Sequence, residues 1–168
     1  MDVKKIILVT VVLMIAVSSL SMVSAGWFDN NIEANTFKFE MPEGYSGDSL
    51  GDGVLLTHEK DGTNLIQVNE IDKANFTSFM NGEPVSFVET SVNGESADSS
   101  NQVVKEVKED NYRIVAQKND LMGMAFTNAV IEKDGSYYSV FISHKYDTSL
   151  IDKDIQIVKD IFDSLEKT

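Results

Sequence analysis

The run of residues that most resembles a known site is a twelve-residue stretch, 48–59, which imitates a calcium-binding loop. Asp48, Asp52 and Glu59 fall at positions 1, 5 and 12, where such a loop places oxygen ligands. Position 3 is Leu50, which has no side-chain oxygen to coordinate an ion. The flanking sequence alternates as strands do, whereas a calcium loop sits between helices. We therefore interpret the stretch as a turn followed by a strand, with a hard-cation site as the alternative.

Histidines and methionines are the other side chains with metal chemistry. The only histidines, His58 and His144, are expected on strands in a chain without cysteine, and two ligands fall short of a zinc site. Four methionines offer the soft thioether sulfur that copper(I) prefers: Met41, Met80, Met122 and Met124. We interpret the histidines as partly buried or surface residues and the methionines as flexible core filling, and we predict neither a metal nor a cofactor.

Nucleophilic catalysis has little support in the sequence. The chain has no cysteine, and no Gly-x-Ser-x-Gly or Ser-x-x-Lys spacing falls on a suitable strand-to-helix turn. A carboxylate pair assembled by the fold remains an alternative, but 27 acidic residues give no reason to choose any two. We assign no catalytic residue. Asn75 opens an Asn-Phe-Thr sequon, and its glycosylation is an open question for an exported chain.

The charge of the chain argues against nucleic acid as a partner. The formal net charge is −13, and the basic residues, with Arg113 as the only arginine, are scattered singly along the chain. Binding to nucleic acid needs clustered cations that displace counterions from phosphates, and an anionic membrane surface selects for the same clusters. The acidic balance leaves solubility, cationic partners and divalent ions as its roles.

The first 25 residues have the layout of a secretory signal. Lys4 and Lys5 precede a continuous apolar run, and the small residues Ser24 and Ala25 suit cleavage before Gly26. We predict a signal peptide over residues 1–25, with an uncleaved N-terminal membrane anchor as the alternative. Residues 26–35 form a lead-in segment, and residues 36–168 are long enough for one domain.

Alternation of apolar and polar residues predicts most of the strands in this domain. It favours strands over 36–41, 53–58 and 64–71, with a hairpin turn at Asp61-Gly62. A meander follows over 103–107, 112–117, 121–132 and 136–145. Its last two strands are apolar on both faces, so we expect them at the centre of the sheet with layers on both sides.

Two helices complete the prediction. A short one over 74–80 packs through Phe76, Phe79 and Met80, and an amphipathic one closes the chain over 148–167, with Ser149 and Asp152 as a capping pair. Residues 84–92 fit a short helix or an edge strand, and residues 93–101 have loop composition. The fold class is α+β, an antiparallel sheet of roughly six or seven strands with helices on its faces.

The opening strand and its turn carry a resemblance to a known family. Phe37-x-Phe39-x-Met41-Pro42-x-Gly44-Tyr45, followed by a hairpin, a long meander and a terminal helix, resembles the PsbP-like fold family over roughly residues 35–166. The resemblance implies an α/β/α sandwich and a binding or assembly-supporting role more than an enzymatic one. No site residue of the family carries over to this chain.

The sequence therefore predicts an exported accessory or binding module that acts outside the cytoplasm, secreted or associated with the cell envelope. Its expected partner is a protein or an envelope component. The alternatives are a secreted hydrolase with a carboxylate pair and a membrane-tethered structural protein of the envelope.

Overall fold

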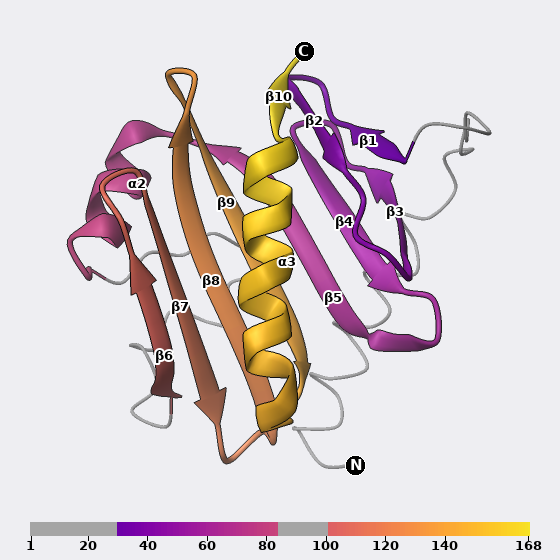
Figure 1. Cartoon of the computed structure of the whole chain (residues 1–168), viewed down its shortest axis with the longest axis vertical. Helices are drawn as coiled ribbons and strands as arrows, with labels where there is room; N and C mark the ends of the chain where they lie inside the picture. The colour runs from indigo at the N-terminus through magenta and orange to yellow at the C-terminus, as the bar shows by residue number, and fades with distance from the viewer. Residues whose placement is uncertain (1–29, 84–100) are drawn as a thin grey trace, which may run out of the picture.

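Seven antiparallel strands form the main sheet of this computed structural model, which describes residues 30–83 and 101–168. Their order across the sheet is β3-β4-β5-β9-β8-β7-β6 (Figure 1). The strands are β3 (Tyr45–Ser49), β4 (Gly53–His58), β5 (Asp61–Ile71), β6 (Asn101–Lys108), β7 (Tyr112–Asn119), β8 (Met124–Lys133) and β9 (Ser136–Lys145). The predicted α+β class and the antiparallel meander are confirmed.

The strands with two apolar faces lie inside the sheet, as predicted. On β8, Ala129 and Ile131 belong to the core cluster beneath the long C-terminal helix, whereas Val130 between them faces the opposite side. Successive side chains of a strand alternate between the faces, so a strand covered on both sides must be apolar at nearly every position. The β8–β9 turn also follows its sequence signal, since Asp134 and Gly135 both have positive φ, at 52° and 76°.

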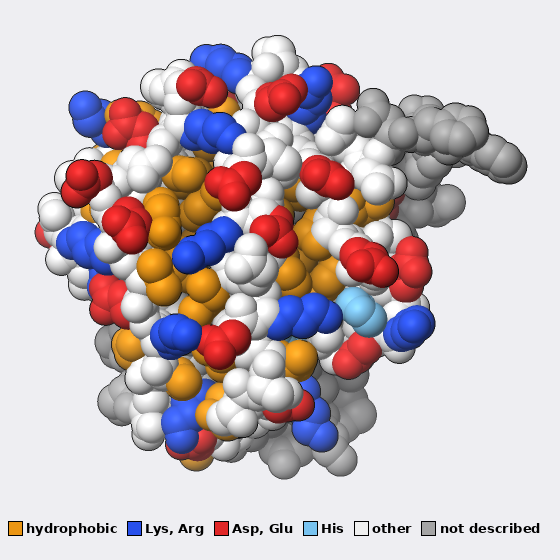
Figure 2. Space-filling model, in the orientation of Figure 1, with side chains coloured by type: hydrophobic (Ala, Val, Ile, Leu, Met, Phe, Trp, Pro, Cys, Tyr) orange, Lys and Arg blue, Asp and Glu red, His pale blue; other side chains and the backbone are white. Residues whose placement is uncertain are grey.

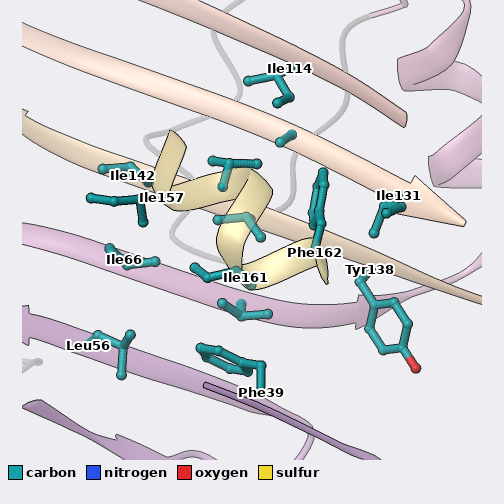
Figure 3. Packing of buried hydrophobic residues seen from close by; sticks show 14 of the residues in the cluster. Phe39, Leu56, Ile66, Ile114, Ile131, Tyr138, Ile142, Ile157, Ile161 and Phe162 are labelled. Atoms are coloured by element: carbon teal, nitrogen blue, oxygen red, sulfur yellow. The ribbon is translucent and has the colours of Figure 1, made fainter. Parts of the chain in front are cut away.

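The helix α3 (Ile151–Ser164) covers one face of the sheet, after a 3₁₀ turn η1 (Thr148–Leu150). Its apolar stripe buries Val158, Ile161 and Phe162 against residues of the sheet such as Leu56 and Ile142 (Figure 3). Burial of this stripe, rather than helix propensity alone, is what stabilises such a helix.

The shorter helix α2 (Lys73–Met80) covers the other face. Phe76 and Phe79 pack against Val115 and Val130 in a second core cluster. The N-terminus of α2 is capped by Asp72, whose side chain accepts from the backbone N–H of Asn75 at 2.7 Å. The predicted helix and its apolar contacts are confirmed.

A second sheet of three short strands was not predicted. It has the order β1-β2-β10, with β1 (Asn31–Glu33), β2 (Phe37–Glu40) and β10 (Glu166–Lys167). The predicted strand at 36–41 therefore belongs to this small sheet, and the predicted helix ends at Ser164 rather than Lys167. Leu165 takes an extended ψ of 127° and is buried, so the chain leaves the helix and pairs with β2.

Three further local predictions were wrong. The β4–β5 turn is centred on Glu59-Lys60, because His58 pairs with Asp61, so Asp61 and Gly62 already lie in β5. Asp147 caps the 3₁₀ turn η1 before α3, since its carboxylate accepts from the N–H of Ser149 at 2.9 Å, and the predicted Ser149–Asp152 pair does not cap α3, whose N-cap residue is Leu150.

The third error concerns the start of β8, which begins at Met124 and not at residue 121. The side chain of Asn119 accepts from the N–H of Met122, and Gly123 has a φ of 64°, so the chain is still turning there. Strand β3 was not predicted at all. The predictions for residues 1–25, 26–29 and 84–92 lie outside the described residues, as does the predicted loop up to residue 100; Asn101 begins β6.

Candidate functional site

An open groove of about 510 Å³ lies between α3 and the turns that precede β3 and follow β4. We call it the α3 groove. Its ionisable lining residues carry both signs of charge: Glu43, Glu59, Asp160, Lys60, Lys153 and His58. Figure 2 shows this face of the molecule, where hydrophobic side chains flank the helix and acidic and basic side chains are interspersed among them. The mixture suits a partner that carries both charges and apolar atoms rather than a polyanion.

The turn before β3 shapes one wall of the α3 groove. Gly44 has a φ of 81°, which glycine adopts without steric cost, and the N–H of Tyr45 donates to the carbonyl of Pro42 at 3.2 Å. A Cβ on Gly44 would lie 3.3 Å from Nε2 of His58. The Pro-x-Gly-aromatic sequence thus turns the chain tightly and lets it approach His58.

His58, the last residue of β4, lines the groove half-buried. Its Nδ1 accepts from the backbone N–H of Lys60 at 3.3 Å, which places the proton of the neutral ring on Nε2. The ring of Tyr45 meets the imidazole edge-on, with centroids 5.1 Å apart. His58 therefore presents an N–H donor near the wall of the groove.

A buried polar cluster lies under the same face. Nε2 of His144 is 2.8 Å from Oδ2 of Asp154, and the hydroxyl of Thr127 donates to the same oxygen at 3.2 Å. All three residues are buried, with exposed fractions of 4% or less. Nδ1 of His144 lies 2.7 Å from the carbonyl of Lys145. We call this the His144 cluster, and it joins β8, β9 and α3.

The two acceptors around His144 favour its doubly protonated form, since a neutral ring could donate to only one of them. The hydrogen bond to Asp154 raises the pKa of His144, burial opposes this, and the carbonyl of Lys145 adds to the increase. Burial also raises the pKa of Tyr45 to about 12, with smaller contributions from Asp154 and Asp61. The raised pKa of His144 is the effect expected of a charged pair held in a largely apolar interface.

A second open groove, of about 580 Å³, lies between the start of β5 and the end of β9. Asp61, Lys145 and Asp147 line it. Hydrogen bonds from Thr63 lower the pKa of Asp61, and those from Ser149 lower the pKa of Asp147. Both carboxylates are therefore occupied in local turns.

The structure confirms the turn-plus-strand interpretation of residues 48–59. Asp48 lies in β3 opposite Leu55, Asp52 accepts from Asn35 at 3.1 Å, and Glu59 follows the far end of β4. Six residues of strand span about 20 Å, so Asp52 and Glu59 lie too far apart to share one ion. In residues 30–83 and 101–168, no group of three or more His, Asp or Glu side chains is placed to hold a metal ion.

Both histidines occupy the end of the sheet where β4 and β9 finish, a neighbourhood that the sequence did not predict. Both lie close enough to Asp61 to affect its pKa. The methionines do not converge. Met41 packs against the first core cluster and Met80 against the second, as core filling predicts, whereas Met122 is 63% exposed.

The His144 cluster was not predicted from the sequence, although the sequence contains one signal for it. Asp154 stands on the apolar stripe of α3, between Ile151 and Val158, where an acid must find a buried partner. Its partner comes from another element, so the spacing of residues along the sequence does not predict it.

Asn75, which opens the glycosylation sequon, lies in the first turn of α2, where its amide donates to Asp72 at 3.2 Å. Within the described residues, no helix is long and apolar enough to span a bilayer.

No family model matches the chain, and no curated protein matches it. Solved structures do match. The solution structure of a cyanobacterial PsbP (CyanoP) from Synechocystis sp. PCC 6803 is 14% identical with a TM-score of 0.49, covering 89% of this chain and 99% of that one. A mutant of the protein Mog1 is 9% identical with a TM-score of 0.46, covering 82% and 95%. A protein from Bacteroides thetaiotaomicron VPI-5482 is 9% identical with a TM-score of 0.42, covering 79% of this chain and 45% of that one. The chain thus has structural similarity to PsbP and Mog1, and this similarity concerns the fold alone.

Proposed function

We propose that this chain is an exported accessory module that binds a segment of another protein in the α3 groove. The single observation that carries the proposal is the groove itself. It is open and lined by charges of both signs, and it lies beside a helix–sheet interface that is filled with apolar side chains. Export rests on the layout of residues 1–25, which has the basic end, apolar run and small-residue ending of a signal peptide.

The chemistry of the groove favours a polypeptide partner. Lys60 and Lys153 offer two ammonium groups, Glu43 and Glu59 offer carboxylates, and His58 adds an N–H donor. An extended or looped segment with alternating charges satisfies such a surface, whereas a nucleic acid or a polyphosphate would be repelled by its acids. The open shape also suits a segment that enters from the side rather than an enclosed small molecule.

No comparable observation favours a hydrolase that uses a carboxylate pair. Asp154 is the only acidic side chain that is buried within the described residues, and it is bound to His144 and Thr127. It lines neither groove. A catalytic acid needs contact with substrate, and this carboxylate instead joins α3 to the sheet.

Site-specific photo-crosslinking in cells that export the chain tests the proposal. A photoreactive residue at Lys60 or Lys153 should yield a covalent adduct with one protein, and Lys153→Glu should weaken the adduct formed from position 60. Lys73 is the matched control, because it is also an exposed lysine but lies on α2, on the opposite face of the sheet. The proposal would be contradicted if position 73 gave as much adduct as positions 60 and 153, or if neither position 60 nor position 153 gave an adduct.

A further inference from the structure

The outer edge of β6 has a charge pattern that complements itself. Strand β6 ends the order of the main sheet, and β7 is its only neighbour among the described strands. It contributes the sequence Lys105-Glu106-Val107-Lys108, and Glu109 follows it directly. Reversing the order of these five residues exchanges every lysine for a glutamate and leaves the valine in the middle. Two such strands placed antiparallel around Val107 therefore put opposite charges face to face.

We propose that two copies of this chain pair through β6 in a two-fold symmetric dimer with one continuous sheet. In this register Val107 lies opposite Val107 of the second copy. Lys105 lies opposite the second copy's Glu109, and Glu106 lies opposite the second copy's Lys108; each pair occurs twice by symmetry. Side chains that are directly opposite on antiparallel strands have Cβ atoms about 5 Å apart, close enough for an ion pair.

The backbone N–H and C=O groups of β6 that this register needs point away from β7, toward the second copy. The N–H of Glu109 donates to the carbonyl of Tyr112 at 2.9 Å, so the polar backbone groups of Glu109 face β7. These groups alternate in direction along a strand, so those of Val107 also face β7, and those of Glu106 and Lys108 face away. Glu106 and Lys108 are the residues that would exchange hydrogen bonds with the second copy, giving about four bonds across the two-fold axis.

The side chains also lie on matching faces. Lys105 contacts Asp152 of α3, and Val107 packs against the core cluster under α3, so the 105–109 pairs form on that face. Glu106 contacts Arg113, and Lys108 donates to the carbonyl of Met80 in α2, so the 106–108 pairs form on the other face. Glu106 would then lie between Arg113 of its own chain and Lys108 of the second copy. Lys105 and its partner Asp152 are both substantially exposed, so this internal ion pair contributes little that the dimer must replace.

The same edge leaves the α3 groove free. The groove is formed beside β3 and β4, at the opposite edge of the sheet from β6. A β6 dimer would carry its two grooves at its outer ends, where two partner segments bind independently. The pairing is short and each chain is acidic, so we expect a weak dimer whose formation depends on concentration.

Sedimentation of the exported protein over about 1–500 µM, in about 0.15 M salt, tests the pairing through charge exchange, since repulsion between the bodies is screened there beyond about 8 Å. Lys105→Glu and Glu109→Lys each place like charges opposite each other twice. Each single variant should therefore raise the dimer Kd roughly fivefold or more. The double variant Lys105→Glu/Glu109→Lys rebuilds both pairs with the charges exchanged, and it should return the Kd to within about twofold of the original.

These variants separate the effect of the strand register on the dimer Kd from the effect of net charge. Lys105→Glu makes the chain more acidic and Glu109→Lys makes it less acidic, yet both should weaken the dimer. Lys73→Glu on α2 changes the net charge as Lys105→Glu does and should leave the Kd nearly unchanged. Circular dichroism checks that every variant is folded. A monomer at all concentrations, a dimer that the single variants leave intact, or a double variant that stays as weak as the singles would each overturn the proposal.

Discussion

At the scale of single residues, His144 is a buried group whose protonation should affect the stability of the fold. Its pKa is raised above the ordinary value of about 6.5, first by the hydrogen bond to Asp154. A group whose folded pKa is raised stabilises the fold fully below its unfolded pKa, and this contribution is lost as the pH rises through the folded pKa. The melting temperature should therefore fall as the pH increases above about 6.5.

The matched variants make this prediction specific to one histidine. His144→Gln should remove this pH dependence, whereas His58→Gln should retain it because His58 lies outside the cluster. Melting followed by circular dichroism between about pH 5.5 and 9 measures both, and the His144 ring proton should titrate in NMR above about pH 6.5. A melting temperature that rises over this range would show that the cluster does not hold the charged ring as described.

The residues of the site were only partly visible in the sequence. Pro42, Gly44 and Tyr45 stood out because a tight turn needs these types at this spacing, and the structure shows that this turn walls the α3 groove. His144 and Asp154 are only ten positions apart, but a turn separates the strand of one from the helix of the other. Their contact depends on how α3 lies on the sheet, which no local pattern specifies.

At the scale of elements, α3 is the segment on which both the core and the groove depend. Ile161 is fully buried, whereas Asp163, two positions later, is exposed. Ile161→Ala removes buried methyl and methylene groups and leaves a cavity, so it should lower the free energy of unfolding by about 2–5 kcal/mol. Asp163→Ala should change it by no more than about 0.5 kcal/mol.

Urea unfolding measures both α3 variants, and the midpoint should shift without a large change in slope for Ile161→Ala. The cavity left by Ile161→Ala should also make the wall of the α3 groove more mobile, because Ile157, on the same apolar stripe, lines the groove. Equal effects from the two substitutions would mean that α3 does not bury the face that the structure assigns to it.

Elements with a strong period were predictable, and short elements fixed by distant partners were not. The alternation of β5, the two apolar faces of β9 and the apolar stripe of α3 follow from burial of one or two faces, so the predicted positions of these elements were close to those observed. Strand β10 has two residues and exists because β2 lies beside it. Likewise, β3 carries Ser46, Gly47 and Asp48, which have no strand propensity and pair only because β4 offers an edge.

At the scale of the whole molecule, the sequence predicted the layers but not their division into two sheets. A meander with two doubly apolar strands requires cover on both faces, and α2 and α3 supply it. The small sheet arises where the chain's first described strands meet its last residues, more than 120 positions away. A contact over that separation has no signature in local periodicity.

Export of the entire chain should change both its mass and its net charge. Residues 1–25 carry Asp2, Lys4 and Lys5, a net charge of +1, so cleavage before Gly26 changes the formal charge from −13 to −14. Intact mass measured on protein recovered outside the cytoplasm should show a first residue of Gly26. Ala25→Arg, which places a bulky charged residue at the cleavage position, should leave the longer chain in the membrane fraction with its charged domain outside. An original chain that stays in the cytoplasm with Met1 attached would contradict both export and the proposed role of the α3 groove in binding a protein outside the cytoplasm, while the pairing of two copies through β6 would remain open to its own test.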